Sequence, residues 1–257
     1  YWKDARNYRK ELISANISIL NLTNNYSNMD NTWLPVPNKT VIKEKVRQLQ
    51  YNKDLNLYKR KRTFDGIYHL HNWSIISDYI DLKTPMKCLE IGSHEGQSAM
   101  YFLKYILTHT ESSLICCDPW IKSHWLNIKP TNLCYEDVFD FNVVNNKGTN
   151  KIIKYEGTNN KLYLESWFKK CIFDIVYIDD IHTYESTVLN ISNCWPQLKT
   201  GGIIIFDDYE KEHAIYDKTD AVKWCDPVKK AVGEFITRNE KNIKILFKHY
   251  QLIIQKI

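Results

Sequence analysis

From about residue 85 onward, short apolar runs rich in β-branched residues alternate with stretches whose apolar positions have helical spacing. This alternation predicts an α/β fold with a doubly wound, Rossmann-like sheet that is mostly parallel. The expected elements are, in chain order, residues 87–91, 97–107, 114–117, 135–145, 151–155, 161–169, 173–178, 184–195, 202–206 and 227–238. Two final apolar runs, 243–247 and 251–257, lie too close together for a crossover helix, so we expect an antiparallel hairpin on the sheet edge.

Residues 1–84 follow a different pattern, and we expect an arm and a helical extension beside a main domain of residues 85–257. The start of the chain is polar and rich in asparagine, which is typical of irregular structure. Residues 41–62 predict a charged helix, and residues 66–81 predict a second, more apolar one that covers or flanks the sheet.

Two of the expected strands each end in a pair of acids, and a histidine follows the first pair. These residues are Asp179, Asp180, His182, Asp207 and Asp208. The helix between the pairs is expected to bury Val188 and Ile191 on one face and to end before Pro196. Because ligands bind beyond the carboxyl ends of the strands in open α/β sheets, the acids and the histidine are expected to converge on a reaction centre.

The segment after the first strand has the composition of a loop that holds a ligand with its backbone. Residues 88–98 read CLEIGSHEGQS: a strand, a tight loop and a helix start that offers unpaired N–H groups. Gly92 and Gly96 permit unusual backbone dihedrals. A nicotinamide site would prefer a further glycine in place of His94, and the two glutamates of this segment disfavour a pyrophosphate.

The next expected strand ends in Asp118, where this kind of fold places a carboxylate that binds ribose hydroxyls. In the alternative interpretation, Asp118 caps the turn that begins at Pro119.

Composition narrows the class of protein. The chain has 257 residues, a net charge of +5 and seven cysteines without a C-x-x-C pair, so we expect reduced, buried thiols and a cytoplasmic location. Its apolar runs fall short of the roughly 20 residues of a membrane span, and we expect a soluble protein without a membrane partner. The abundance of Asn, Lys, Ile and Tyr is typical of AT-rich genomes, viral ones among them.

The basic residues cluster at Lys59–Arg62. This cluster has two interpretations. It is a positively charged binding surface for RNA or an acidic ligand, or it is the solvent-exposed end of a helix. Charge alone does not decide the partner, and the sequence leaves a homo-oligomer open.

Together these motifs resemble those of class I S-adenosylmethionine-dependent methyltransferases. The motifs are E-x-G-x-x-x-G after the first strand, an acid after the second, E-G-T after the third, D-x-x-H-x-Y-E after the fourth and L-K-x-G-G…D-D-Y around the fifth, within residues 87–235. The chain is most similar to the macrocin/mycinamicin-type sugar O-methyltransferases. Many of these relatives have D-G-D-H after the fourth strand, whereas this chain has D-D-I-H, which leaves open whether Asp179 or Asp180 is a ligand.

The resemblance implies a class I methyltransferase fold, S-adenosylmethionine as cofactor and specific roles for residues. It implies a cofactor site of Glu90, Gly92, Ser93, Gly96, Ser98, Asp118, Gly157, Thr158 and Asp179. In that site Asp118 holds the ribose, while Gly157 and Thr158 lie near the adenine. It implies a metal site of Asp179, Asp207 and Asp208, and it places His182, with Asp179, at the acceptor hydroxyl as catalytic residues.

The predicted activity is methyl transfer to a hydroxyl of a sugar or of another small-molecule or glycan acceptor. This in-line displacement requires an aligned acceptor that loses its proton. Carboxylates suit Mg²⁺ or Mn²⁺, which favour the alkoxide, and a histidine can take the proton near neutral pH. The less specific interpretation is that Asp179 and Asp207 cap turns and that His182 only supports its neighbours.

Two other functions stay open. An RNA cap ribose 2'-O-methyltransferase would need Lys211 or Lys218 beside Asp179, with Lys61 and Glu234 completing the set. Alternatively, a degenerate methyltransferase fold binds a partner without catalysis.

Overall fold

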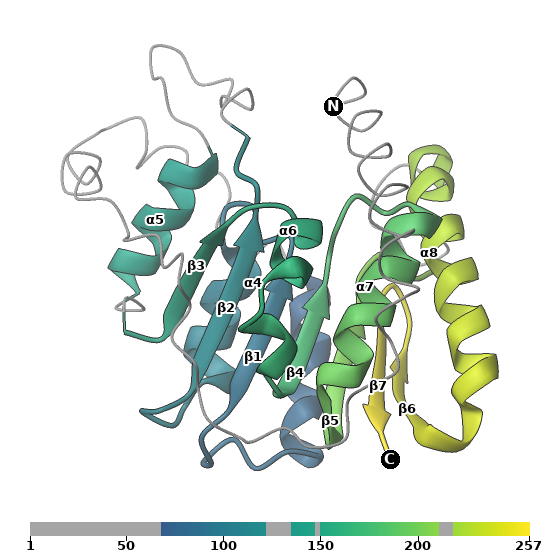
Figure 1. Cartoon of the computed structure of the whole chain (residues 1–257), viewed down its shortest axis with the longest axis horizontal. Helices are drawn as coiled ribbons and strands as arrows, with labels where there is room; N and C mark the ends of the chain where they lie inside the picture. Colours follow the sequence, from purple (N-terminus) through teal and green to yellow (C-terminus); the bar gives the residue numbers. More distant parts are fainter. Residues whose placement is uncertain (1–67, 122–134, 147–149, 211–217) are drawn as a thin grey trace.

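The computed structural model describes residues 68–121, 135–146, 150–210 and 218–257. Its centre is a seven-stranded sheet with the order β3-β2-β1-β4-β5-β7-β6 (Figure 1). The pairs among β1 to β5 are parallel, whereas β7 pairs antiparallel with both β5 and β6. The doubly wound sheet and its antiparallel hairpin at one edge are confirmed.

The strands lie close to their expected positions. They are β1 (Lys87–Ile91), β2 (Ser113–Asp118), β3 (Ile152–Glu156), β4 (Phe173–Ile178), β5 (Leu198–Phe206), β6 (Ile243–Lys248) and β7 (Leu252–Lys256). The helices are η2 (Tyr68–Asp78), α4 (Gln97–Tyr101), η3 (Phe102–Ile106), α5 (Tyr135–Asn145), α6 (Asn159–Leu164), η4 (Phe168–Lys170), α7 (Tyr184–Gln197), α8 (Lys218–Asn239) and η6 (Glu240–Asn242).

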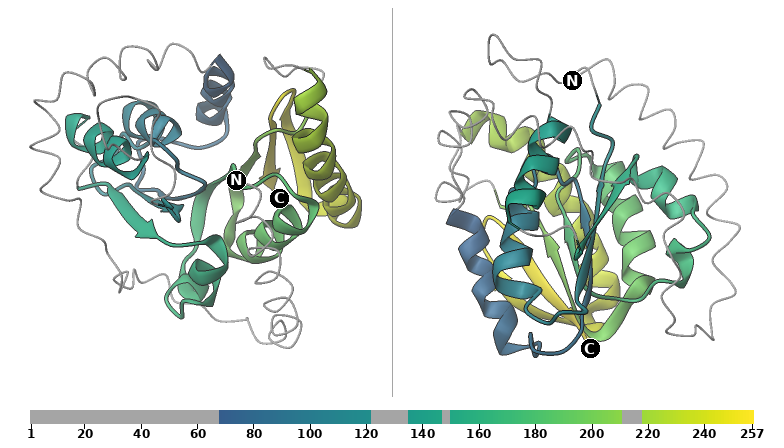
Figure 2. Two further views of the ribbon diagram at one scale, coloured as in Figure 1. Left: turned by 90° about the horizontal axis from the view of Figure 1, so that it is seen from above. Right: turned by 90° about the vertical axis from the view of Figure 1, so that its left-hand side faces the viewer.

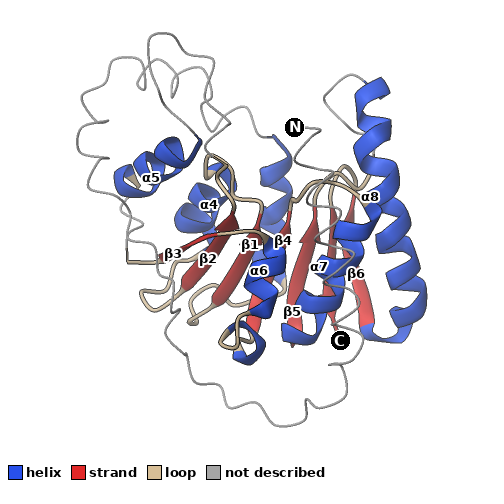
Figure 3. Cartoon of the chain, turned by 45° about the horizontal axis from the view of Figure 1, so that its top comes forward, coloured by secondary structure: helices blue, strands red, loops and turns tan. Residues whose placement is uncertain are grey.

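Helices cover both faces of the sheet (Figures 2 and 3). One apolar core joins one face of the strands to α6, α7 and α8, and includes Leu89, Val176 and Val232. The other core joins the opposite face to η2, α4 and α5, and includes Trp73 and Tyr177. This three-layer arrangement follows from strands that are apolar on both sides.

Several helices differ from their expected form. The segment at 66–81 is a 3₁₀ helix where it is described, and the helix expected at 97–107 changes to a π-helix at Phe102. Helix α8 begins at Lys218 and contains Pro227, which was expected to start it. The helix expected at 41–62 and the basic cluster at its end lie outside the described residues.

The expected apolar face of α7 is buried only in part. Val188 is 36% exposed, whereas Asn190 is fully buried beside Ile191. The reason is that Asn190 donates to Asp180, so a polar residue occupies a position that an apolar pattern cannot reveal. Pro196 lies inside the last turn of the helix, not after it.

The strand ends are aligned so that their following residues leave the sheet side by side. Ile91 of β1, Ile178 of β4 and Phe206 of β5 stand in one row. The backbone N–H of Asp179 then donates to Ile91, and that of Asp207 donates to Ile178, at 2.9 and 3.0 Å. This register brings the loops after three strands to one place.

Two further expectations concern cysteines and membranes. The six cysteines of the described residues are free and buried, as predicted. In the part of the chain that the structure describes, helices fall short of the length and apolarity needed to cross a membrane.

Candidate active site

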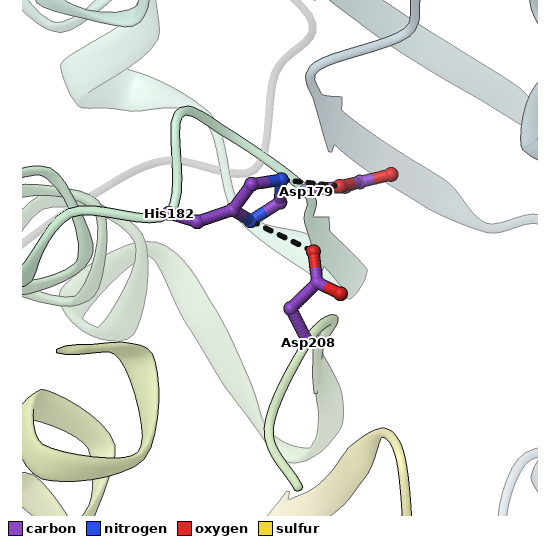
Figure 4. A group of neighbouring side chains, drawn as sticks. All are labelled: Asp179, His182 and Asp208. Atoms are coloured by element: carbon purple, nitrogen blue, oxygen red, sulfur yellow. Dashed lines mark ion pairs between the residues drawn. The ribbon is translucent and has the colours of Figure 1, made fainter. Parts of the chain in front are cut away.

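Three side chains at the carboxyl ends of β4 and β5 form what we call the acid–imidazole group: Asp179, His182 and Asp208 (Figure 4). His182 Nδ1 lies 3.0 Å from Oδ2 of Asp208, and His182 Nε2 lies 3.7 Å from Oδ1 of Asp179. One donor atom from each residue lies within 4.8 Å of the others. Two carboxylates and an imidazole at this spacing fit a divalent transition ion such as Mn²⁺.

Charge inside the acid–imidazole group is concentrated. Burial lowers the pKa of His182, but the Asp208 carboxylate, together with Asp179 and Asp207, outweighs burial and raises this pKa to about 9. Burial and the nearby Asp207 carboxylate raise the pKa of Asp179 well above its usual range. At neutral pH the imidazole is therefore protonated, and its positive charge lies between two carboxylates, where a cation would also be stabilised.

Each of the three acids expected to bind metal receives a hydrogen bond from a neutral donor. The pairs are Tyr177 with Asp179 at 3.0 Å, Gln251 with Asp207 at 2.6 Å, and Tyr250 with Asp208. None of these three donors was predicted from the sequence. Tyr177 precedes its partner by two positions on the same strand, a spacing that could have signalled it. Tyr250 and Gln251 come from the turn between β6 and β7 and carry no such signal.

The four acids after β4 and β5 have different surroundings. Asp179 and Asp208 belong to the acid–imidazole group, whereas Asp207 lies beside it and lines a small cavity together with His182. Asp180 serves another purpose, because its Oδ2 accepts hydrogen bonds from three side chains. The donors are Asn159 at 2.7 Å, Asn190 at 3.2 Å and Ser186. Geometry therefore selects Asp179, not Asp180, as the partner of His182.

The loop after β1 closes around Glu90. This carboxylate is fully buried and accepts hydrogen bonds from Ser93 at 2.8 Å and from Ser98. Burial raises the pKa of Glu90, and these hydroxyl donors oppose that shift. Glu90 thus supports the loop from below, and its predicted role in the cofactor site stays a prediction.

At two positions of this loop, backbone conformation and close neighbours exclude any side chain larger than that of glycine. Gly92 has a φ of +87°, and a Cβ there would lie 1.8 Å from the backbone oxygen of Asp179. Gly96 has a φ of +82°, and a Cβ there would lie 2.8 Å from the ring of Phe139. Gly92 therefore lets the loop after β1 touch the loop after β4.

Asp118 joins the loops after β1 and β2. Its Oδ2 accepts the backbone N–H of His94 at 2.9 Å, and its Oδ1 accepts that of Trp120 at 2.7 Å. The Trp120 indole donates to the backbone oxygen of His94 at 2.7 Å. The turn-capping interpretation of Asp118 is therefore observed, and this half-buried carboxylate retains lone pairs with which to accept ribose hydroxyls.

The loop after β3 lies beside these residues. The N–H of Gly157 donates to the backbone oxygen of Asp118 at 3.0 Å, and Thr158 caps the start of α6. Both residues are half-buried, as are Gly92 and Ser98. The residues expected to hold an adenosyl group thus share one partly exposed edge and include one acid for the ribose, which fits S-adenosylmethionine.

Backbone strain collects at this edge. The non-glycine residues with positive φ among the described ones are His94, Trp120, His182 and Asp208, at 44°, 37°, 53° and 51°. Each of them follows a different strand: β1, β2, β4 or β5. Such conformations cost about 1–2 kcal/mol each and persist where the surrounding structure holds them, most often at functional sites.

The lysine set of the RNA alternative gains no support. Glu234 accepts hydrogen bonds from Tyr184 and Arg238 at 2.7 and 2.9 Å, so it is engaged between α7 and α8. Lys61, Lys211 and the side chain of Lys218 lie outside the described residues.

A family model covers the strand-end site. Residues 89–209 match the family model described as a methyltransferase domain. The matched segment runs from β1 to just beyond β5 and contains Gly92, Gly96, Asp118 and the acid–imidazole group, which supports S-adenosylmethionine-dependent methyl transfer.

Solved structures share the fold at low sequence identity. The SAH-bound methyltransferase PaMTH1 of Podospora anserina is 16% identical, with a TM-score of 0.54 over 88% of this chain and 99% of that one. An O-methyltransferase from Bacillus cereus in complex with SAH is 15% identical, with a TM-score of 0.53 over 87% and 94%. CalS11, a calicheamicin methyltransferase, is 14% identical, with a TM-score of 0.50 over 91% and 99%. A search of curated proteins gives no match.

Proposed function

We propose that this protein transfers a methyl group from S-adenosylmethionine to a hydroxyl of a sugar or of another small-molecule or glycan acceptor, with help from a divalent cation. The acid–imidazole group carries the proposal, because it lies next to the loop of Gly92 and has donor atoms for a cation and a base for a proton. The structurally similar protein from Bacillus cereus is an O-methyltransferase. The macrocin/mycinamicin-type resemblance of the sequence motifs favours a sugar.

Reaction of a hydroxyl with the sulfonium methyl forms an O–CH₃ bond, breaks the S–CH₃ bond and releases the hydroxyl proton. The cofactor supplies the methyl group, and a divalent cation bound by Asp179 and Asp208 would supply positive charge that favours the alkoxide. Hydrogen bonding to Asp208 fixes His182 with Nδ1 as donor, which leaves Nε2, 3.7 Å from Asp179, to accept the proton. A bound cation would lower the raised pKa of this imidazole and so favour the neutral form that acts as the base. Asp118 and the loop after β1, which contains Gly92 and Gly96, position the cofactor.

The first experiment is calorimetric titration with S-adenosylhomocysteine, with and without Mg²⁺ or Mn²⁺. Wild-type protein should bind it with micromolar affinity, and Asp118→Ala should bind at least about tenfold more weakly, because a carboxylate hydrogen bond is worth about 1.5–3 kcal/mol. Absence of binding under every condition would refute the methyltransferase proposal.

Asp208→Asn tests the chemistry separately from binding. We expect methyl transfer to fall by roughly 10²–10⁴-fold, because the base loses its orienting carboxylate, while S-adenosylhomocysteine still binds. Acceptors are screened with sugars first and capped RNA second. Full activity of the wild type in EDTA would exclude the cation from the mechanism, and turnover on capped RNA alone would replace the sugar proposal.

A further inference from the structure

A buried tryptophan of η2 lies behind two of the strand-end acids. Trp73 is 1% exposed, and its indole packs edge-on against Tyr177 with 4.7 Å between ring centroids. Its Nε1 donates to Oε1 of Gln251 at 2.9 Å. Tyr177 and Gln251 donate in turn to Asp179 and Asp207. One residue therefore contacts both side chains that hold these carboxylates.

The indole fixes the direction of the Gln251 amide. An indole N–H is only a donor, so the amide oxygen must face it, and the amide NH₂ then faces Asp207. In the flipped orientation the amide oxygen would meet a carboxylate, and the NH₂ would meet the indole N–H. Gln251 is fully buried, so water cannot compensate for either repulsive contact.

We propose that Trp73 and Gln251 are positioning residues that hold the Asp207 carboxylate toward the acid–imidazole group and thereby raise the affinity of that group for a divalent cation. This inference rests on the proposed function, because it assumes that the group binds a cation. Two observations support it.

The first observation is proximity. Asp207 and Asp179 follow the paired residues Phe206 and Ile178, and the Asp207 N–H donates to the Ile178 backbone oxygen at 3.0 Å, so Asp207 lies beside Asp179 of the group. The second is shared support: Trp73 contacts both Gln251 and Tyr177, and these side chains donate to Asp207 and Asp179. Residues that orient metal-site ligands from behind commonly change metal affinity by 10–100-fold when mutated.

The decisive variants remove single donors and keep the packing. Trp73→Phe retains an aromatic ring against Tyr177 but loses the N–H that fixes the amide. Gln251→Met has a similar shape and loses both amide contacts. The matched control is Trp167→Phe, because Trp167 is 2% exposed and its Nε1 has no hydrogen-bond partner.

The measurement is Mn²⁺ binding, followed by electron paramagnetic resonance of free Mn²⁺ at pH 8. We expect dissociation constants about tenfold higher for Trp73→Phe and Gln251→Met than for the wild type, and an unchanged value for Trp167→Phe. S-adenosylhomocysteine binding, measured on each protein, establishes that the variant is folded.

Each contrary outcome has its own meaning. Equal Mn²⁺ affinity in the wild type and both folded variants overturns the positioning role, as does an equal loss in Trp167→Phe. A wild type that binds S-adenosylhomocysteine but not Mn²⁺ also overturns the positioning role, but it leaves the proposal of methyl transfer intact. A wild type that binds Mn²⁺ but not S-adenosylhomocysteine refutes the proposed function, and the Mn²⁺ series still decides the roles of Trp73 and Gln251.

Discussion

The two halves of the strand-end site are held in different ways. On the cofactor side, formed by the loops after β1, β2 and β3, Glu90 accepts hydrogen bonds from serines of its own loop, and Asp118 accepts backbone N–H groups. On the acid side, formed by the loops after β4 and β5, Asp207 and Asp208 depend on side chains 44 and 42 residues further along the chain. The first half is supported by its own and adjacent loops, whereas the second is assembled from distant parts of the sequence.

The two halves also differ in how their buried charges are stabilised. Next to the cofactor side, a buried lysine has opposite charges beside it: Lys154 of β3 is fully buried and lies 2.9 and 2.7 Å from Glu136 and Asp140 of α5, near the Trp120 ring. On the acid side, burial and the carboxylates of Asp207 and Asp208 raise the pKa of Asp179, and a single imidazole, that of His182, lies beside these acids. A bound cation would relieve that repulsion.

The largest expected effect tests whether the cofactor side is held by its own charges. Lys154→Met removes the buried cation that lies beside two buried carboxylates and should lower the free energy of unfolding by about 3–5 kcal/mol. The control is Lys199→Met, which breaks a partly exposed pair with Asp174 and should cost about 0–1 kcal/mol. Urea denaturation measures both, and equal losses would contradict this account of the cofactor side.

A second substitution acts where the two halves touch. Gly92→Ala combines a left-handed φ with a clash against Asp179 and should cost about 2–4 kcal/mol. Gly201→Ala has a similar φ of +83° but nothing within 4 Å, so it should cost only about 1–2 kcal/mol. The midpoints of urea unfolding compare the stabilities of the two variants. If the two variants are equally stable, the contact between the halves is not the reason for glycine at position 92.

A third test is a pH dependence that belongs to the acid side. His182 has a pKa of about 9 in the folded, metal-free protein, above the usual 6.5, so its ion pair contributes fully below pH 6.5 and is lost as the pH rises to 9. The melting temperature of the wild type should therefore fall toward that of His182→Gln across this range in EDTA. A constant difference between the two proteins would show that the imidazole does not gain a proton on folding.

The sequence predicted what depends on neighbouring residues. Strands β1 and β4 have the bounds that their apolar runs indicate, and the acid pairs mark where β4 and β5 end. The partners of those acids were not predictable, because Tyr250 and Gln251 reach them only through the pairing of β5 with β7. The role of Asp180 was hidden as well, since its partners lie on α6 and α7.

The β6–β7 hairpin also has a consequence for the order of events during synthesis. Its residues are made after every acid that they support, so the glycine loop and Asp118 can reach their folded arrangement while Asp207 and Asp208 still lack their partners. Contacts between residues far apart in the chain form late and slowly. A newly made molecule would thus form the loops after β1 and β2 first and fix Asp207 and Asp208 last, when the hairpin closes the edge of the sheet.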